Sequence, residues 1–108
     1  PGHSFIGYGK KVMALNDNDA LRADLNACNA YTNGPDAAKS ITQSALCILA
    51  KNDRMTPLKF GQKMAKTLVN TEIKVIDGGG HMLPAECPAE VNAALRSFFN
   101  NPDKRAVL

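Results

Sequence analysis

The sequence predicts an α/β fold in which two parallel strands, joined by a crossover helix, follow a group of helices. Short apolar runs at residues 45–49 and 72–76 indicate the two strands. Residues 57–68 between them have apolar positions at helical spacing, and parallel pairing requires a connection of about that length. The first run is apolar at consecutive positions, a pattern typical of a strand covered on both faces of a parallel sheet.

Two helices are expected ahead of the first strand. Residues 8–15 have a short helical pattern, and residues 19–32 have a longer one that follows Asn and Asp, which cap helices well. An Asn-Gly-Pro sequence predicts the end of the second helix, with Gly34 at a C-cap-like position. Residues 36–40 add at most one further turn. The apolar residues of these helices either pack in a core or line a substrate pocket; they include Met13, Leu21, Leu25 and Tyr31.

The elements after the first strand have clearer boundaries. Thr56 is expected to cap the crossover helix, and Pro57 to occupy its first position. Ile73 and Val75 share one face of the second strand. The last helix, residues 88–99, has the strongest periodic signal in the chain. Its apolar residues are Val91, Ala94, Leu95, Phe98 and Phe99.

The bulk properties fit one soluble globular domain. The chain has 108 residues, of which 44% are hydrophobic and 21% charged. The net charge of +3 comes from scattered basic residues, so a nucleic-acid partner is not expected. Neither a long apolar run nor a signal-peptide pattern is present, so we expect a cytoplasmic protein without membrane contact. Cys28, Cys47 and Cys87 are interpreted as free, mostly buried thiols, and no spacing predicts a metal site.

An acid and a histidine follow the two predicted strands. Asp53 comes just after the first, and His81 comes after the second and a run of three glycines. Because parallel strands end at the same edge of a sheet, the two side chains are expected within hydrogen-bonding reach. Such a pair is the orienting half of a nucleophile–base–acid triad. Separately, Asp53 could be a turn or capping residue and His81 a loop residue. The glycines are expected to give the loop unusual backbone angles; a phosphate cradle is disfavoured because no Gly-Lys-Ser/Thr sequence follows.

These loops resemble the C-terminal end of an α/β-hydrolase fold protein. In that family the acid loop reads G-x-x-D-x-x-x-P and the histidine loop reads G-x-G-H-x-x-x-x-E-x-P. The matching residues are Asp53, Pro57, Gly78, Gly80, His81, Glu86 and Pro88. Ala50 stands where Gly is usual, and Ser44 where Pro often opens the strand. The resemblance is strong over residues 45–99 and looser over 7–34, which look like the end of the family's helical cap.

The resemblance implies a division of the chain and a set of roles. Residues 1–43 would be a cap-like helical segment, 44–101 the C-terminal α/β-hydrolase segment, and 102–108 a tail. Asp53 and His81 would be the acid and base of a triad that hydrolyses an ester, lactone or related bond of a small molecule, without a metal or organic cofactor. Residues expected to contact substrate are Met55, Met82 and Tyr31.

The nucleophile and the oxyanion hole are expected to lie outside this chain. Ser4 belongs to a G-x-S-x-x-G sequence, one position off the G-x-S-x-G elbow, and no apolar strand precedes it. We therefore expect a loop entering a helix at Ser4, and no activity from the chain alone. A two-stranded sheet is marginal, and residues 45–49 would form an open edge, which predicts self-association or docking with a missing N-terminal half. The alternative is a non-catalytic remnant or partner-binding module of the same fold.

Overall fold

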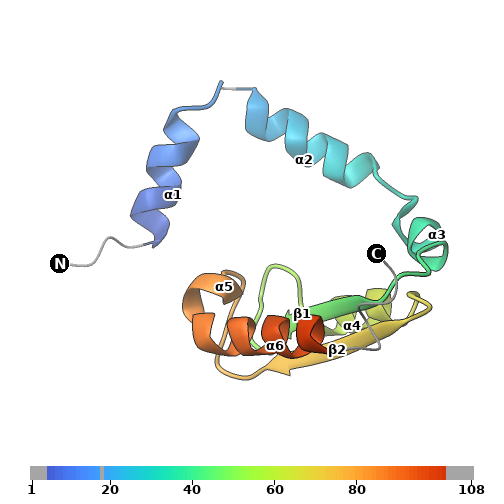
Figure 1. The fold of residues 1–108 in the computed structure, drawn as a ribbon. Coiled ribbons are helices and arrows are strands. Elements are labelled where there is room, and N and C mark those ends of the chain that lie inside the picture. The colour runs from blue at the N-terminus through green and yellow to red at the C-terminus, as the bar shows by residue number, and fades with distance from the viewer. Residues whose placement is uncertain (1–4, 18, 102–108) are drawn as a thin grey trace. The chain divides into compact units, whose positions relative to one another are not determined.

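The computed structural model describes residues 5–17 and 19–101 (Figure 1). Its elements in chain order are α1 (Phe5–Ala14), α2 (Ala20–Ala30), α3 (Gly34–Lys39), β1 (Ala45–Ala50), α4 (Leu58–Ala65), β2 (Thr71–Ile76), α5 (Leu83–Glu86) and α6 (Pro88–Asn100). Ser4 and the predicted tail at 102–108 lie outside the described residues. Contacts divide the chain into a first unit, Pro1–Asn33, and a second unit, Gly34–Leu108. This division falls before α3, whereas the resemblance placed the boundary after residue 43.

The first unit contains α1 and α2, close to where helices were predicted. None of the residues of α2 is buried, and Asp19 precedes the helix without a side-chain capping bond. The carboxylate of Asp19 instead pairs with Arg22 at 3.0 Å on the surface. The prediction of Gly34 as a C-cap is wrong: Tyr31 closes α2, and Gly34 and Pro35 open α3. A proline is tolerated there because the first turn of a helix leaves its N–H groups unpaired.

The sheet confirms the predicted parallel pairing. β1 and β2 run parallel in register from Ala45 opposite Thr71 to Ala50 opposite Ile76, and among the described residues they form a two-stranded sheet. The pairing extends beyond the strands, because the N–H of Lys51 donates to the carbonyl of Ile76 at 3.0 Å. In the loops that follow, the N–H of Asn52 donates to the carbonyl of Gly79 at 3.2 Å. The two strands therefore deliver their following loops to one edge.

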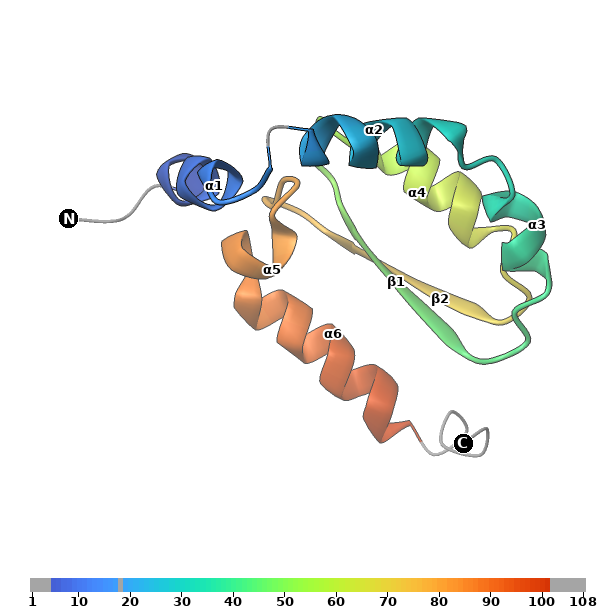
Figure 2. The same cartoon turned by 90° about the horizontal axis from the view of Figure 1, so that it is seen from above.

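Helices cover the two faces of this sheet. Figure 2 shows α4 and α6 on opposite sides of β1 and β2. On the α6 side the core consists of Ala50, Ile76, Leu83 and Val91, with Ile48 and Cys87 packed against it. On the α4 side Gly61 allows close approach, because a Cβ there would lie 2.7 Å from Cδ2 of Leu49. Burial is only partial on the face that Ile73 and Val75 share, since each of these side chains is 38% exposed.

Several local predictions need correction. Thr56 does not cap α4, which begins at Leu58 after Pro57. The short helix α5 was not predicted, because four residues are too few to show a period. Cys28 is exposed rather than buried, while Cys47 and Cys87 are half-buried and all three are free thiols. Within the described part of the chain, every helix is too short or too polar to cross a bilayer.

Candidate active site

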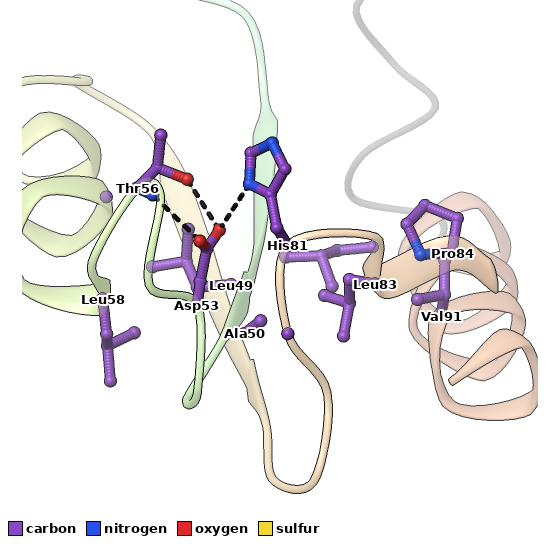
Figure 3. Close-up of a pocket in the computed structure, with 12 residues that line it drawn as sticks. Leu49, Ala50, Asp53, Thr56, Leu58, His81, Leu83, Pro84 and Val91 are labelled. Carbon is purple, nitrogen blue, oxygen red and sulfur yellow. Dashed lines mark hydrogen bonds and ion pairs between the residues drawn. The ribbon is translucent and has the colours of Figure 1, made fainter. Parts of the chain in front are cut away.

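Asp53 and His81 meet at the carboxyl edge of the sheet. Nδ1 of His81 lies 3.1 Å from Oδ2 of Asp53, as Figure 3 shows. The geometric prediction is confirmed: the loops after β1 and β2 bring together two side chains 28 positions apart in sequence. The side chain of Asp53 is 11% exposed, and that of His81 is 41% exposed. The carboxylate is therefore enclosed, while the imidazole ring remains accessible to a reacting group.

The loop around Asp53 saturates its carboxylate. Oδ1 accepts the backbone N–H of Met55 at 2.8 Å and that of Thr56 at 2.9 Å. Oδ2 accepts the hydroxyl of Thr56 at 2.6 Å, in addition to its contact with His81. An aspartate that bonds to N–H groups two and three residues later is a common turn arrangement. The turn interpretation and the pairing with His81 are thus both correct, and one residue does both.

These contacts fix the charge of Asp53 and the proton position on His81. The hydroxyl and backbone hydrogen bonds from Thr56 hold the pKa of the Asp53 carboxyl well below its usual range, with smaller contributions from His81 and Met55. An ionised carboxylate can only accept hydrogen bonds. Nδ1 of His81 must therefore be the donor in this contact, which leaves Nε2 of the neutral ring with a free lone pair. Figure 3 shows that second nitrogen directed away from Asp53.

The glycines before His81 have different roles. Only Gly78 adopts a positive φ, of 91°, so one glycine rather than three supplies the unusual backbone angle that was predicted. Gly79 instead allows close packing, because a Cβ there would lie 2.3 Å from Cδ1 of Leu83. Gly80 lies against the carboxylate of Glu86. The turn at Gly78 and the close contacts of Gly79 and Gly80 therefore shape the loop that connects β2 to His81.

A pocket of about 300 Å³ adjoins the pair. Both Asp53 and His81 line it. The rest of its wall is mainly apolar and includes Ile48, Leu49, Leu58, Leu83 and Val91. Because successive side chains of a strand point to opposite faces, a pocket that touches both Ile48 and Leu49 must pass over the open edge of β1. An apolar cavity with few polar groups is typical of a small-molecule site.

The other residues predicted to contact substrate are Met55 and Met82 in the second unit and Tyr31 in the first. Met55 lies two positions after Asp53, and Met82 directly follows His81. Their side chains are nevertheless 73% and 50% exposed and do not line the pocket. Tyr31 is 65% exposed on the first unit. Their substrate-binding roles stay predictions. Thr56, which the sequence interpretation assigned to a helix cap, is instead a direct partner of the acid, and its signal was the D-x-x-T spacing.

Among residues 5–17 and 19–101, no three His, Cys, Asp or Glu side chains gather in a way that could hold a metal ion.

Comparisons with known proteins show what the chain is similar to. No protein-family model matches the chain. It is 36% identical over 59 residues to the protein ABHD8 of Bos taurus, covering 55% of this chain and 14% of ABHD8. It is 26% identical over 65 residues to the uncharacterized hydrolase YugF of Bacillus subtilis, covering 60% of this chain and 24% of YugF. The chain thus spans less than a quarter of the length of either curated relative.

A solved structure extends the likeness to most of the chain. MGS-MChE2, an α/β hydrolase enzyme from a metagenome of lagoon sediments of Mar Chica, Morocco, superposes with a TM-score of 0.69. The match covers 89% of this chain and 45% of that one at 24% identity, and it shows the fold. Together with the parallel strands and their loops, these likenesses confirm the resemblance predicted from the sequence: over part of its length, the chain is related to proteins of the α/β-hydrolase fold.

Proposed function

We propose that this chain supplies the acid and the base of a hydrolytic triad, Asp53 and His81, to an α/β hydrolase that acts on an ester, lactone or related bond of a small molecule. The observation that carries the proposal is the 3.1 Å contact between Nδ1 of His81 and a carboxylate held ionised by Thr56. The relation to α/β-hydrolase fold proteins and the adjoining apolar pocket support it.

The geometry suggests how the pair would act. Asp53 fixes the tautomer of His81 and stabilises the imidazolium that forms during reaction. Nε2 then takes a proton from the nucleophile, or from the water that hydrolyses a covalent intermediate, and later returns it to the leaving group. The nucleophile and oxyanion donors come from polypeptide outside this chain. The small molecule would lie with its reacting carbonyl near Nε2 of His81, beside the end of the pocket that Asp53 and His81 line.

Activity measurements test the proposal when a nucleophile is supplied. The protein to assay is this chain within a longer polypeptide, or co-expressed with the coding region that lies beside it, with p-nitrophenyl butyrate and a γ-lactone as substrates. We expect His81→Ala and Asp53→Asn each to lower kcat by about 10⁴-fold, as loss of a triad partner does. Matched controls are Asp77→Asn, an exposed acid at the end of β2, and Ser4→Ala. Turnover that survives both site substitutions would favour a non-catalytic module.

The chain by itself is expected to give no ester turnover above a protein-free control. Loss of the nucleophile removes most triad catalysis, and the oxyanion hole that supplies the residual rate is also expected to lie outside this chain. The measurement is hydrolysis of p-nitrophenyl butyrate by the purified chain. Turnover that Ser4→Ala abolishes would contradict this expectation and assign the nucleophile to Ser4.

The open edge of β1 is proposed as the place where the completing polypeptide, or a second copy, docks. Backbone N–H groups of Ala45 and Lys51 bond toward β2, so the alternate groups at Leu46, Ile48 and Ala50 point to the other edge. Light scattering during size-exclusion chromatography should show mass rising with concentration. Leu46→Pro removes one outward N–H and should weaken association, whereas a monomer at high concentration would contradict the proposal.

A further inference from the structure

The carboxylate of Glu86 holds the backbone on both sides of His81. Oε2 accepts the N–H of Gly80 at 2.6 Å, and Oε1 accepts the N–H of Met82 at 3.0 Å. The two N–H groups belong to the residues immediately before and after the histidine. Glu86 is the last residue of α5, and its own N–H donates to the carbonyl of Met82 at 3.0 Å. One side chain thus closes a small ring of hydrogen bonds around the histidine loop.

This arrangement acts on the direction in which the imidazole points. The bond to Met82 restrains the peptide unit that directly follows the Cα of His81, and the bond to Gly80 restrains the peptide unit between Gly79 and Gly80, one step further back in the loop. Together the two bonds limit the backbone angles that set the direction of the Cα–Cβ bond of His81. The contact between Nδ1 and Asp53 depends on that direction, because 3.1 Å lies near the long end of the range for an N–H···O hydrogen bond. We infer that Glu86 is a positioning residue: it holds the loop so that His81 keeps its contact with Asp53.

The packing of Gly80 supports this inference independently. A Cβ on Gly80 would lie 3.0 Å from Oε2 and 3.3 Å from Oε1 of Glu86. The approach is tighter than most side chains accept, so the absence of a side chain at this position lets the carboxylate reach both amides. Gly80 has no positive φ that would by itself exclude alanine. Its spacing from Glu86 in the histidine loop therefore has a physical reason in the carboxylate contact.

The inference rests on the proposed role of His81 as base, and nuclear magnetic resonance of the whole chain can test the two separately. The sequence has two histidines, His3 and His81, so ¹⁵N-histidine labelling gives two ring systems, assigned with His3→Gln. In the wild type we expect the Nδ1-protonated tautomer of His81 to dominate. In Glu86→Ala we expect it to become the minor form. Exchange of the Gly80 and Met82 amides should accelerate about tenfold or more, as expected for losing bonds to a charged acceptor.

Graded and matched variants keep the test sharp. Glu86→Gln retains a carbonyl acceptor, so its effect should lie between those of the wild type and Glu86→Ala. Gly80→Ala displaces the carboxylate without removing it and should shift the tautomer in the same direction. Glu90→Ala removes a glutamate from the first turn of α6 and should change neither readout. Thermal unfolding of each variant separates a loss of the whole fold from a local change.

The outcomes discriminate between the two ideas. A wild-type His81 without the Nδ1-protonated form, or one that Asp53→Asn leaves unchanged, would overturn the proposed function. A wild-type tautomer that depends on Asp53 but persists in both folded Glu86→Ala and folded Gly80→Ala would overturn the role of Glu86 alone. If Glu86→Ala does not fold, the result with Gly80→Ala decides. Loss of the tautomer in a variant whose unfolding temperature is unchanged supports positioning rather than a general structural role.

Discussion

The two units of this chain have similar helical patterns and very different burial. In the second unit, Val91 and Ala94 of α6 face the sheet and are 9% and 8% exposed. In the first unit, Leu21 and Leu25 have comparable spacing along α2, yet they are 51% and 60% exposed. The difference shows that an apolar stripe predicts a helix but does not say against what the helix packs. The sheet provides that surface in the second unit.

The same contrast bears on stability. Isolated helices of about 10 residues are marginal in water, because nucleation costs more than a few hydrogen bonds return. The ion pair between Arg22 and Asp19 adds little, since both side chains are more than 70% exposed. The second unit has a core around Ile76 and paired strands that tie residues distant in sequence. We therefore expect the two units to differ in stability.

The largest effect is expected from truncating a core side chain. Ile76 is 3% exposed, and Ile76→Ala should cost about 2–5 kcal/mol of unfolding free energy. A core of this size rarely supplies more than about 3–5 kcal/mol, so the variant should lose the second unit's fold. Leu25→Ala on α2 makes a matched deletion at an exposed site and should change stability by less than about 0.5 kcal/mol. Urea unfolding measures the change in unfolding free energy for both variants. Equal changes would contradict the expected difference in stability between the two units.

A smaller effect is expected in amide exchange of the intact chain. Backbone amides that pair β1 with β2 should exchange about a hundredfold more slowly than in an unstructured chain, or slower still. That protection corresponds to a free energy of about 3 kcal/mol for opening the second unit. Amides of α1 and α2 should exchange at nearly the rate of an unstructured chain. Hydrogen–deuterium exchange followed by mass spectrometry gives both values at once. Protection of α2 equal to that of β1 would show that the first unit has a stabilising partner.

Much of the second unit could be predicted from the sequence. The strands extend the predicted runs at 45–49 and 72–76 by only one residue each. The first run is apolar at consecutive positions, and the second is bounded by Asp77 and Gly78, so each left few alternatives. The last helix was predicted within one residue, since its apolar positions follow one period and a proline opens it. Gly34 was misassigned because glycine before proline fits either the end of one helix or the start of the next.

The site was predicted in part. The parallel topology alone places Asp53 beside His81, so that pair followed from strand order. Thr56 and Glu86 could not be placed in the same way, because their roles depend on loop angles rather than on topology. The D-x-x-T sequence was compatible with a helix cap, and only the geometry shows the hydroxyl donating back to the carboxylate. The pocket was not predicted, because its wall combines residues from both faces of the sheet at the edge of β1, and the sequence does not show how these residues come together.

The smallest effect sharpens the comparison at the site, where the hydroxyl of Thr56 is the largest of several causes that lower the pKa of the acid. Thr56→Val removes the 2.6 Å bond to Oδ2, the largest cause of the lowered pKa of Asp53, so that pKa should rise toward its ordinary value of 3.8. Thr67→Val is the matched control, because its hydroxyl donates to a carbonyl at the end of α4. Carbon-detected titration of the Asp53 carboxyl measures the shift. An unchanged pKa in Thr56→Val would show that the backbone bonds suffice.

The sign of this shift also predicts a dependence of stability on pH. A carboxyl whose pKa is lower in the folded state stabilises the fold above its unfolded pKa, and that contribution is lost as pH falls toward the folded pKa. The wild-type second unit should therefore lose stability when pH falls below about 3.8, and Thr56→Val should lose less over the same interval because its two pKa values lie closer together. Urea unfolding at pH 5 and pH 3 compares the two proteins. Equal losses would mean that other carboxyls dominate acid unfolding, whereas a smaller loss in Thr56→Val would tie the acid stability of the second unit to the carboxylate that orients His81.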